Sequence, residues 1–310
     1  MPTDSAIAVS EVTHRYGARV AVDQLSLTIH EGEIFVFLGP NGSGKTTLFR
    51  LLSTLIPLQA GEVTILGHDL GRETTAARCK LGVVFQSPSL DKKLSVAENL
   101  SHQGRLYGLS AAEIESRSRQ MLSALGLAER RAELVETLSG GMRRRVELAK
   151  GMLHQPRLLL LDEPSTGLDP GARVDLWQYL QQVRDEGVTV VMTTHLLEEA
   201  ERADRIAIMH QGRIAALDSP AALQASVGGD SITIRSDRPD ELASGIREKF
   251  ECDATVIDNS VRLEQPDGHQ WISRLVEAFP DDIQSVTLGK PTLEDVFIDR
   301  TGHQYLSEGL

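Results

Sequence analysis

Short apolar runs and alternating segments dominate the first two thirds of the chain. Residues 34–38 and 158–161 are apolar throughout, which is typical of strands buried on both faces of a mixed or parallel sheet. Residues 20–29 alternate between apolar and polar positions, as a half-buried strand does. Further strands are expected at residues 6–12, 63–66, 81–85, 188–192 and 205–209.

Helical spacing of leucines follows the first apolar run. We predict a helix that begins at Lys45 and is stopped by Pro57, because proline cannot continue a helix. Its apolar stripe consists of Leu48, Leu51, Leu52 and Leu55. Residues 95–155 are mostly helical by pattern, with breaks at 107–109 and 125–127, and another helix is expected around residues 174–183. This order of strands and helices predicts an α/β core with a helical insertion.

Beyond Pro220 the pattern changes to a smaller alternation of strands and helices. Strands are expected at residues 232–235, 254–257, 261–263 and 285–288, and helices at 240–250 and 269–278. We therefore predict two domains. The first covers residues 1–220 and contains a helical subdomain at about 87–155, and the second is a small α/β domain at 221–310.

The balance of charge limits the partners that the chain can have. The 310 residues carry a net charge of −12, of which residues 221–310 contribute −9 (8 Lys and Arg against 17 Asp and Glu). An acidic surface repels the phosphates of nucleic acids, so we expect no direct nucleic-acid partner. No apolar stretch is long enough to span a membrane, no signal peptide is visible, and two cysteines form no metal-like pattern. We expect a cytosolic, reduced protein.

A glycine-rich loop joins the apolar strand at 34–38 to the leucine-striped helix. Residues 39–46 fit the pattern G-x-x-x-x-G-K-[ST] in the strand–loop–helix setting that a phosphate-binding loop requires. We expect Lys45 to reach the β- and γ-phosphates of ATP, Thr46 to bind Mg²⁺ and Thr47 to contact the α-phosphate. The backbone cradle around the phosphates is assigned to Gly39, Asn41, Gly42, Ser43 and Gly44.

Two carboxylates follow the second apolar strand. Asp162 is predicted to hold Mg²⁺, partly through water, and Glu163 to accept the proton of the attacking water. The alternative for Asp162 is a cap on the segment that begins at Pro164. The phosphate loop upstream favours the catalytic interpretation.

Residues 138–142 (LSGGM) place Ser139, Gly140 and Gly141 at the start of a helix, which is a second anion-binding helix end. With this motif the chain resembles the ABC-type ATPases, the nucleotide-binding subunits of ABC transporters. The resemblance implies the P-loop fold of that family with a mixed or parallel sheet. It also implies that two copies pair head to tail as a homodimer, so that the serine-led helix of one copy contacts the γ-phosphate held by Lys45 of the other.

Other residues match the family's motifs in order along the chain. The resemblance implies that Gln86 touches Mg²⁺ and faces the membrane partner, and that Asp169 lies at the dimer seam. It implies that His195 contacts the γ-phosphate, as a catalytic residue beside Glu163 and Lys45. Tyr16 occupies the place of the aromatic residue that stacks on adenine. The arginines at 143–145 are interpreted as solvent-facing or salt-bridged rather than as a nucleic-acid site.

Residues 105–109 and the tail resemble the branch that serves permeases of the ABC-2 type, including daunorubicin-resistance-like and sodium-efflux-like ATPases. Residues 291–298 are close to that branch's closing motif. The resemblance implies an ATP-hydrolysing exporter subunit on the cytoplasmic face of the membrane, bound to a separate permease, with drug or antibiotic cargo. The alternatives are an importer ATPase and a non-transport ABC ATPase that acts on nucleic acid or the ribosome.

Overall fold

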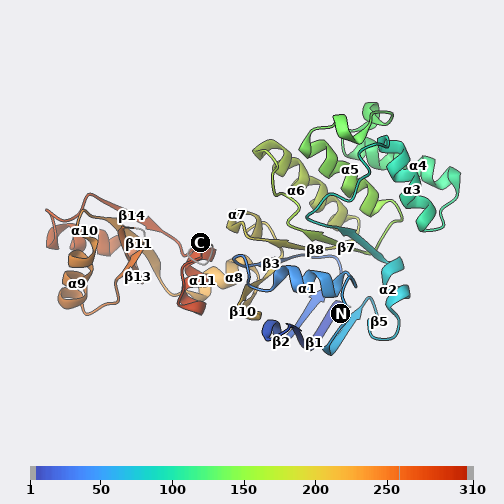
Figure 1. Cartoon of the computed structure of the whole chain (residues 1–310). Coiled ribbons are helices and arrows are strands. Elements are labelled where there is room, and N and C mark those ends of the chain that lie inside the picture. Colours follow the sequence, from blue (N-terminus) through green and yellow to red (C-terminus); the bar gives the residue numbers. More distant parts are fainter. Residues whose placement is uncertain (1–4, 258, 306–310) are drawn as a thin grey trace. The chain divides into compact units, whose positions relative to one another are not determined.

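The computed structural model describes residues 5–257 and 259–305, and within these the chain divides into two compact units (Figure 1). The first unit ends at Ser219 and the second begins at Pro220. In this part of the chain no helix combines the length and the apolar composition that a membrane crossing needs.

A six-stranded sheet forms the centre of the first unit. Its order is β10-β9-β3-β8-β7-β6, and every neighbouring pair is parallel except β10 with β9. The strands are β3 (Ile34–Leu38), β6 (Leu81–Val84), β7 (Leu158–Asp162), β8 (Thr189–Thr194), β9 (Arg205–His210) and β10 (Arg213–Asp218). All residues of β3, β7 and β8 are buried, as the apolar runs predict. Because these strands run parallel, the residues that follow them meet at one edge of the sheet.

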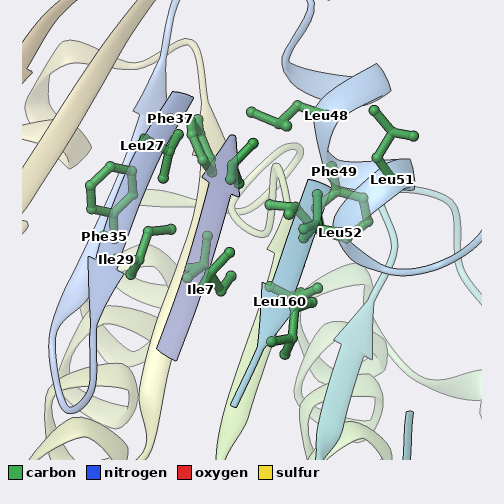
Figure 2. Packing of buried hydrophobic residues seen from close by; sticks show 14 of the residues in the cluster. Ile7, Leu27, Ile29, Phe35, Phe37, Leu48, Phe49, Leu51, Leu52 and Leu160 are labelled. Carbon is green, nitrogen blue, oxygen red and sulfur yellow. The ribbon is translucent and has the colours of Figure 1, made fainter. Parts of the chain in front are cut away.

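A second, antiparallel sheet has the order β2-β1-β4-β5. Its strands are β1 (Ser5–Tyr16), β2 (Arg19–His30), β4 (Ala60–Ile65) and β5 (His68–Asp69). One hydrophobic core takes side chains from both sheets and from α1 (Lys45–Leu52). Leu48, Phe49, Leu51 and Leu52 of the helix belong to this core together with Phe37 of β3 and Leu160 of β7 (Figure 2). The helix that follows the phosphate loop is therefore anchored by its apolar face.

The predicted end of this helix at Pro57 is wrong, since the helix ends at Leu52. Thr54 has a left-handed backbone with φ of +60°. Arg78 donates a 2.7 Å hydrogen bond to the Thr54 hydroxyl and a 3.1 Å bond to its carbonyl oxygen. These tertiary hydrogen bonds hold Thr54 outside the helical conformation, an effect that local sequence does not reveal. The helix α2 (Thr74–Cys79), which carries Arg78, was not predicted.

The helical insertion consists of α3 (Val96–Leu106), α4 (Ala111–Ala124) and α5 (Gly140–Met152). Both breaks expected from the sequence lie between helices or at a helix end. Ser95 and Ser110 form capping boxes with the glutamates three residues later, which fixes the starts of α3 and α4. Two further helices complete the unit, α6 (Pro170–Asp185) and α7 (Leu197–Ala200).

The second unit has the order β-α-β-β-α-β, with flanking helices at each end. Its sheet is antiparallel with the order β12-β13-β11-β14, which is the ferredoxin-like arrangement. Its strands are β11 (Asp230–Arg235), β12 (Thr255–Ile257), β13 (Ser260–Gln265) and β14 (Ser285–Gly289). Its helices are α8 (Pro220–Ser226), α9 (Pro239–Phe250), α10 (Gly268–Ala278) and α11 (Leu293–Thr301). The core beneath α9 and α10 includes Ile232, Ile234 and Leu263.

Candidate nucleotide-binding site

Glycines allow the loop after β3 to fold tightly. Gly42 and Gly44 have φ values of +85° and +105°, which side-chain-bearing residues rarely adopt. A Cβ on Gly44 would lie 2.4 Å from the Ala21 carbonyl oxygen. Gly39 does not have a left-handed backbone, but a Cβ on it would lie 2.5 Å from the Met209 carbonyl oxygen. Gly39, Gly42 and Gly44 are therefore required by the backbone conformation or by the close approach of neighbouring backbone.

Lys45 points back into this loop. Its Nζ donates hydrogen bonds to the carbonyl oxygens of Gly39 at 2.6 Å and Pro40 at 2.9 Å. Burial lowers the pKa of Lys45, and the nearby carboxylates of Glu163 and Asp162 counteract part of that effect. The Ser43 hydroxyl is also buried, and it has no hydrogen-bond partner within the described part of the chain. A buried cation and a buried hydroxyl at a helix N-terminus suit a polyphosphate.

An open groove of about 390 Å³ runs beside the loop. It brings together eight of the predicted site residues, Tyr16, Asn41, Gly42, Gly44, Lys45, Thr46, Thr47 and Glu163. Tyr16 is 46% exposed, and its ring meets that of the buried His14 edge to face at a centroid distance of 4.9 Å. Arg19 also lines the groove, although the sequence pattern did not single it out.

Asp162, the last residue of β7, is buried at the edge of the sheet. Its Oδ1 accepts a 2.6 Å hydrogen bond from the hydroxyl of Thr193 in β8, so the side chain bonds to a neighbouring strand. Burial raises the pKa of Asp162 and the adjacent Glu163 adds to the rise, whereas the Thr193 hydrogen bond and the cations Arg50 and Lys45 lower it. A further cation in this place would favour the charged form of Asp162.

The donor set fits Mg²⁺. The Thr46 hydroxyl, the Asp162 carboxylate and the side-chain carbonyl of Gln86 are hard oxygen ligands of the kind that Mg²⁺ takes alongside water and phosphate oxygens. The Gln86 amide uses its Nε2 as a donor to Glu163, which leaves its oxygen as the acceptor.

Glu163 joins residues that lie far apart in the sequence. Its Oε2 accepts hydrogen bonds from Gln86 Nε2 at 3.0 Å and from the Thr166 hydroxyl at 3.2 Å. Its Oε1 lies 3.4 Å from Nδ1 of His195. The Glu163 backbone is left-handed, with φ of +42°, and its N–H bonds to both the hydroxyl (3.0 Å) and the carbonyl oxygen (3.2 Å) of Thr193. Strain at a hydrogen-bonded carboxylate beside a groove is typical of a functional position.

The signature segment, which is the LSGGM motif at residues 138–142, does not line the groove in the part of the chain that the structure describes. Ser139 caps α5, its hydroxyl accepting a 3.2 Å hydrogen bond from the Met142 N–H, and both Ser139 and Gly140 are exposed. Asp169 caps α6 by accepting a 2.9 Å bond from the Ala172 N–H. Among the described residues that line the groove, none is Ser139, Gly140, Gly141 or Asp169. Residues 139–141 thus leave the N-terminal end of α5 open to solvent.

Two residues of the arginine run form the expected salt bridges. Arg145 pairs with Asp175 at 3.4 Å, and Arg144, which is buried and only 9% exposed, pairs with Glu147 at 3.0 Å. Its guanidinium donates to the carbonyl oxygens of Phe85, Asp162 and Pro164. The sequence carried a signal for the burial of Arg144. Glu147 and Leu148 follow it by three and four residues, so all three lie on the same, buried face of α5.

Known proteins place this geometry in context. The family model described as ABC transporter matches residues 22–166. The daunorubicin resistance ATP-binding protein DrrA3 of Streptomyces coeruleorubidus is 38% identical over 305 residues, covering 96% of both chains. The Nod factor export ATP-binding protein I of Sinorhizobium fredii is 42% identical over 313 residues, covering 97% of this chain and 88% of its own.

Solved structures agree with these relatives. An ATP-binding subunit of an ABC transporter matches with a TM-score of 0.66 and 28% identity, covering 72% of this chain and 93% of its own. The protein cbiO1 of Clostridium perfringens, described as part of the ABC transporter complex cbiONQ, matches with a TM-score of 0.67 and 25% identity. That match covers 80% of this chain and 96% of cbiO1.

Proposed function

Because the chain belongs to the ABC transporter family of ATP-binding proteins, we propose that two copies of it close head to tail around two ATP molecules and drive export through a separate membrane permease. The chain is an ATPase of an ABC exporter, with the P-loop fold of that family. The observation that carries the proposed mechanism is the convergence of Gln86, His195 and Thr166 on Glu163 beside Lys45.

Each side chain has a defined task at the bound nucleotide. The exposed ring of Tyr16 stacks on adenine, and the loop amides with Lys45 hold the β- and γ-phosphates. Thr46, Asp162 and Gln86 hold Mg²⁺, which supplies charge neutralisation on the phosphates when it is bound.

Glu163 accepts a proton from the attacking water at a carboxylate oxygen while the water oxygen bonds to the γ-phosphorus and the bond to ADP breaks. The hydrogen bonds from Gln86 and Thr166 fix one Glu163 oxygen, and His195 lies beside the other. From that position His195 orients the carboxylate and reaches towards the γ-phosphate. These contacts hold the base in place before the nucleotide arrives.

The second half of each site comes from the other copy. The exposed start of α5 presents Ser139, Gly140 and Gly141 as a helix N-terminus that suits a γ-phosphate. Within the part of the chain that the structure describes, this end of α5 does not line the groove, so a head-to-tail pair supplies each groove with the partner copy's α5. Asp169, which starts α6, lies at the seam of that pair.

The permease partner is inferred from the relatives, whose names describe resistance and export. We assign it to the ABC-2 type, with drug or antibiotic cargo, which places the ATPase on the cytoplasmic face of the membrane. The helical insertion at residues 87–155 offers the docking surface. The importer and nucleic-acid alternatives are not favoured, because these relatives span nearly the whole chain.

Replacing Glu163 by Gln tests the mechanism. The variant keeps the groove, so MgATP binding should stay within a few-fold of wild type, while turnover falls by about 10²–10⁴-fold because the general base is gone. Light scattering with ATP should then show a trapped dimer. A Lys45→Ala change added to this variant serves as the control and should remove the dimer. Wild-type turnover would refute the general-base assignment, and an ATP-bound monomer would refute the sandwich.

A further inference from the structure

The helix that begins at the signature segment reaches the catalytic residues through its buried polar face. Arg144 donates from Nε to the Pro164 carbonyl oxygen at 2.8 Å and from Nη2 to the Asp162 carbonyl oxygen at 3.1 Å. These two carbonyls flank Glu163. Nη1 donates to the Phe85 carbonyl oxygen at 2.6 Å, directly before Gln86. One guanidinium therefore binds the backbone on both sides of the general base and next to its glutamine partner.

A carboxylate on the next helical turn completes this arrangement. Glu147 is 4% exposed, and its Oε2 accepts a 3.0 Å hydrogen bond from Arg144 Nη1. Its Oε1 accepts from the Ser89 N–H, and Lys150 donates a 2.8 Å bond to the Ser89 carbonyl oxygen. The segment 85–89 is thus bonded to α5 at both of its ends.

Tight packing alone does not explain a buried ion pair here. Burying an arginine and a glutamate costs desolvation energy, and apolar side chains of similar volume often stabilise a fold as well or better. A guanidinium differs from an apolar side chain in its rigid fork of donors, which fixes the directions of several acceptors at once. The three backbone acceptors of Arg144 belong to the two segments that carry Gln86 and Glu163, so the pair fixes the relative position of those segments.

We propose that Arg144 and Glu147 are positioning residues for hydrolysis, which link α5 to the loops of Gln86 and Glu163 within one subunit. The start of α5 in one subunit contacts the γ-phosphate bound by the other subunit. When that contact moves α5, the link transmits the movement to Glu163 of the subunit to which α5 belongs. This inference rests on the proposed function, because it needs Glu163 as the base. It adds a route by which the two sites of a dimer influence each other.

The substitution Arg144→Met tests the link while leaving the groove intact. Because the loops of Glu163 and Gln86 lose their common anchor, kcat should fall by about 10²-fold, whereas MgATP affinity and KM stay within about threefold. Arg145→Ala is the matched control, since it also removes an arginine from α5. Arg145 binds Asp175 and the Leu125 carbonyl oxygen instead of the loops of Gln86 and Glu163. The control should retain most of the turnover. A kcat of Arg144→Met within twofold of wild type would overturn the proposal.

A double variant separates positioning from stability. Arg144→Met alone leaves Glu147 as a buried unpaired charge, so its Tm should fall as well. Arg144→Met with Glu147→Leu removes both charges, and its Tm should return towards the wild-type value while kcat stays low. Recovery of kcat together with Tm would show a merely structural pair and overturn the proposal. Loss of MgATP binding in the wild type would count against the proposed function instead.

Discussion

Charged groups are buried in both units of the molecule, but they are satisfied in different ways. In the first unit, Lys45 lines an open groove and Asp162 is next to Glu163, which lines it as well. Burial lowers the pKa of Lys45 and raises the pKa of Asp162, so it favours the neutral form of each side chain. In the second unit, Asp295 of α11 is 1% exposed and forms an ion pair with Arg262 of β13. The other Asp295 oxygen accepts hydrogen bonds from the N–H and hydroxyl of Thr292, which starts α11.

This difference distinguishes a binding site from a structural contact. Groups at the groove have unused bonding capacity, and their charges are stabilised further only when an ion or ligand arrives. The Arg262–Asp295 pair is complete within its own unit, because Arg262 also donates a 3.0 Å hydrogen bond to the Ser231 hydroxyl. The closing motif at 291–298 therefore has a physical role, which is to fasten α11 to the polar face of the sheet.

Lys45→Ala is expected to give the largest effect, which is a loss of ATP affinity with little change in stability. ATP affinity should fall by about 100-fold or more, equivalent to about 3 kcal/mol, because the β- and γ-phosphates lose their buried cation. The stability of the nucleotide-free protein should change by less than about 1 kcal/mol, since the desolvated charge is removed along with its two hydrogen bonds. Calorimetric titration and thermal unfolding measure the two quantities. Unchanged ATP affinity would mean that the loop does not hold the phosphates.

The opposite result is expected from Asp295→Ala in the second unit. The substitution leaves Arg262 buried without its carboxylate and removes the Asp295 half of the capping box of α11, so that unit should lose about 3 kcal/mol of stability. ATP affinity should stay within twofold of wild type. Differential scanning calorimetry of the full chain, with and without ATP, checks both. Asp299→Ala is the control, because Asp299 is half exposed and pairs with the adjacent Arg300 at 3.5 Å. Equal stability of the two variants would contradict the structural role.

The parts of the molecule that follow from local sequence were predicted well. Residues 34–38 form a strand with the expected bounds, and the fold class is confirmed. The phosphate-binding motif at residues 39–47 is contiguous and runs from the loop after β3 into α1, so its sequence pattern already specifies its geometry. The predicted helices of the tail begin within one residue of α9 and α10. The periodicity of apolar positions is sufficient in these cases.

Features that depend on tertiary hydrogen bonds were not predicted. The early end of α1 depends on Arg78, which lies 24 residues from Thr54. The burial of Arg144 depends on carbonyl groups that the chain brings to α5 from 20 and 59 residues away. Three consecutive arginines look alike in the sequence, and only their positions around the helix separate the buried one from the others. A helical-face analysis of residues 143–151 could have identified it.

The smallest effect is expected at Tyr16, whose aromatic ring lines the groove and is about half exposed. Stacking on a base contributes about 1–3 kcal/mol, and exposure places Tyr16 near the lower limit, so Tyr16→Ala should weaken ATP binding about fivefold. Tyr16→Phe keeps the ring and should bind ATP within twofold of wild type. Affinity for inorganic triphosphate, which lacks a base, should be the same in all three proteins. If Tyr16→Ala weakened triphosphate binding as much as ATP binding, the ring would act on the shape of the loop and not on adenine.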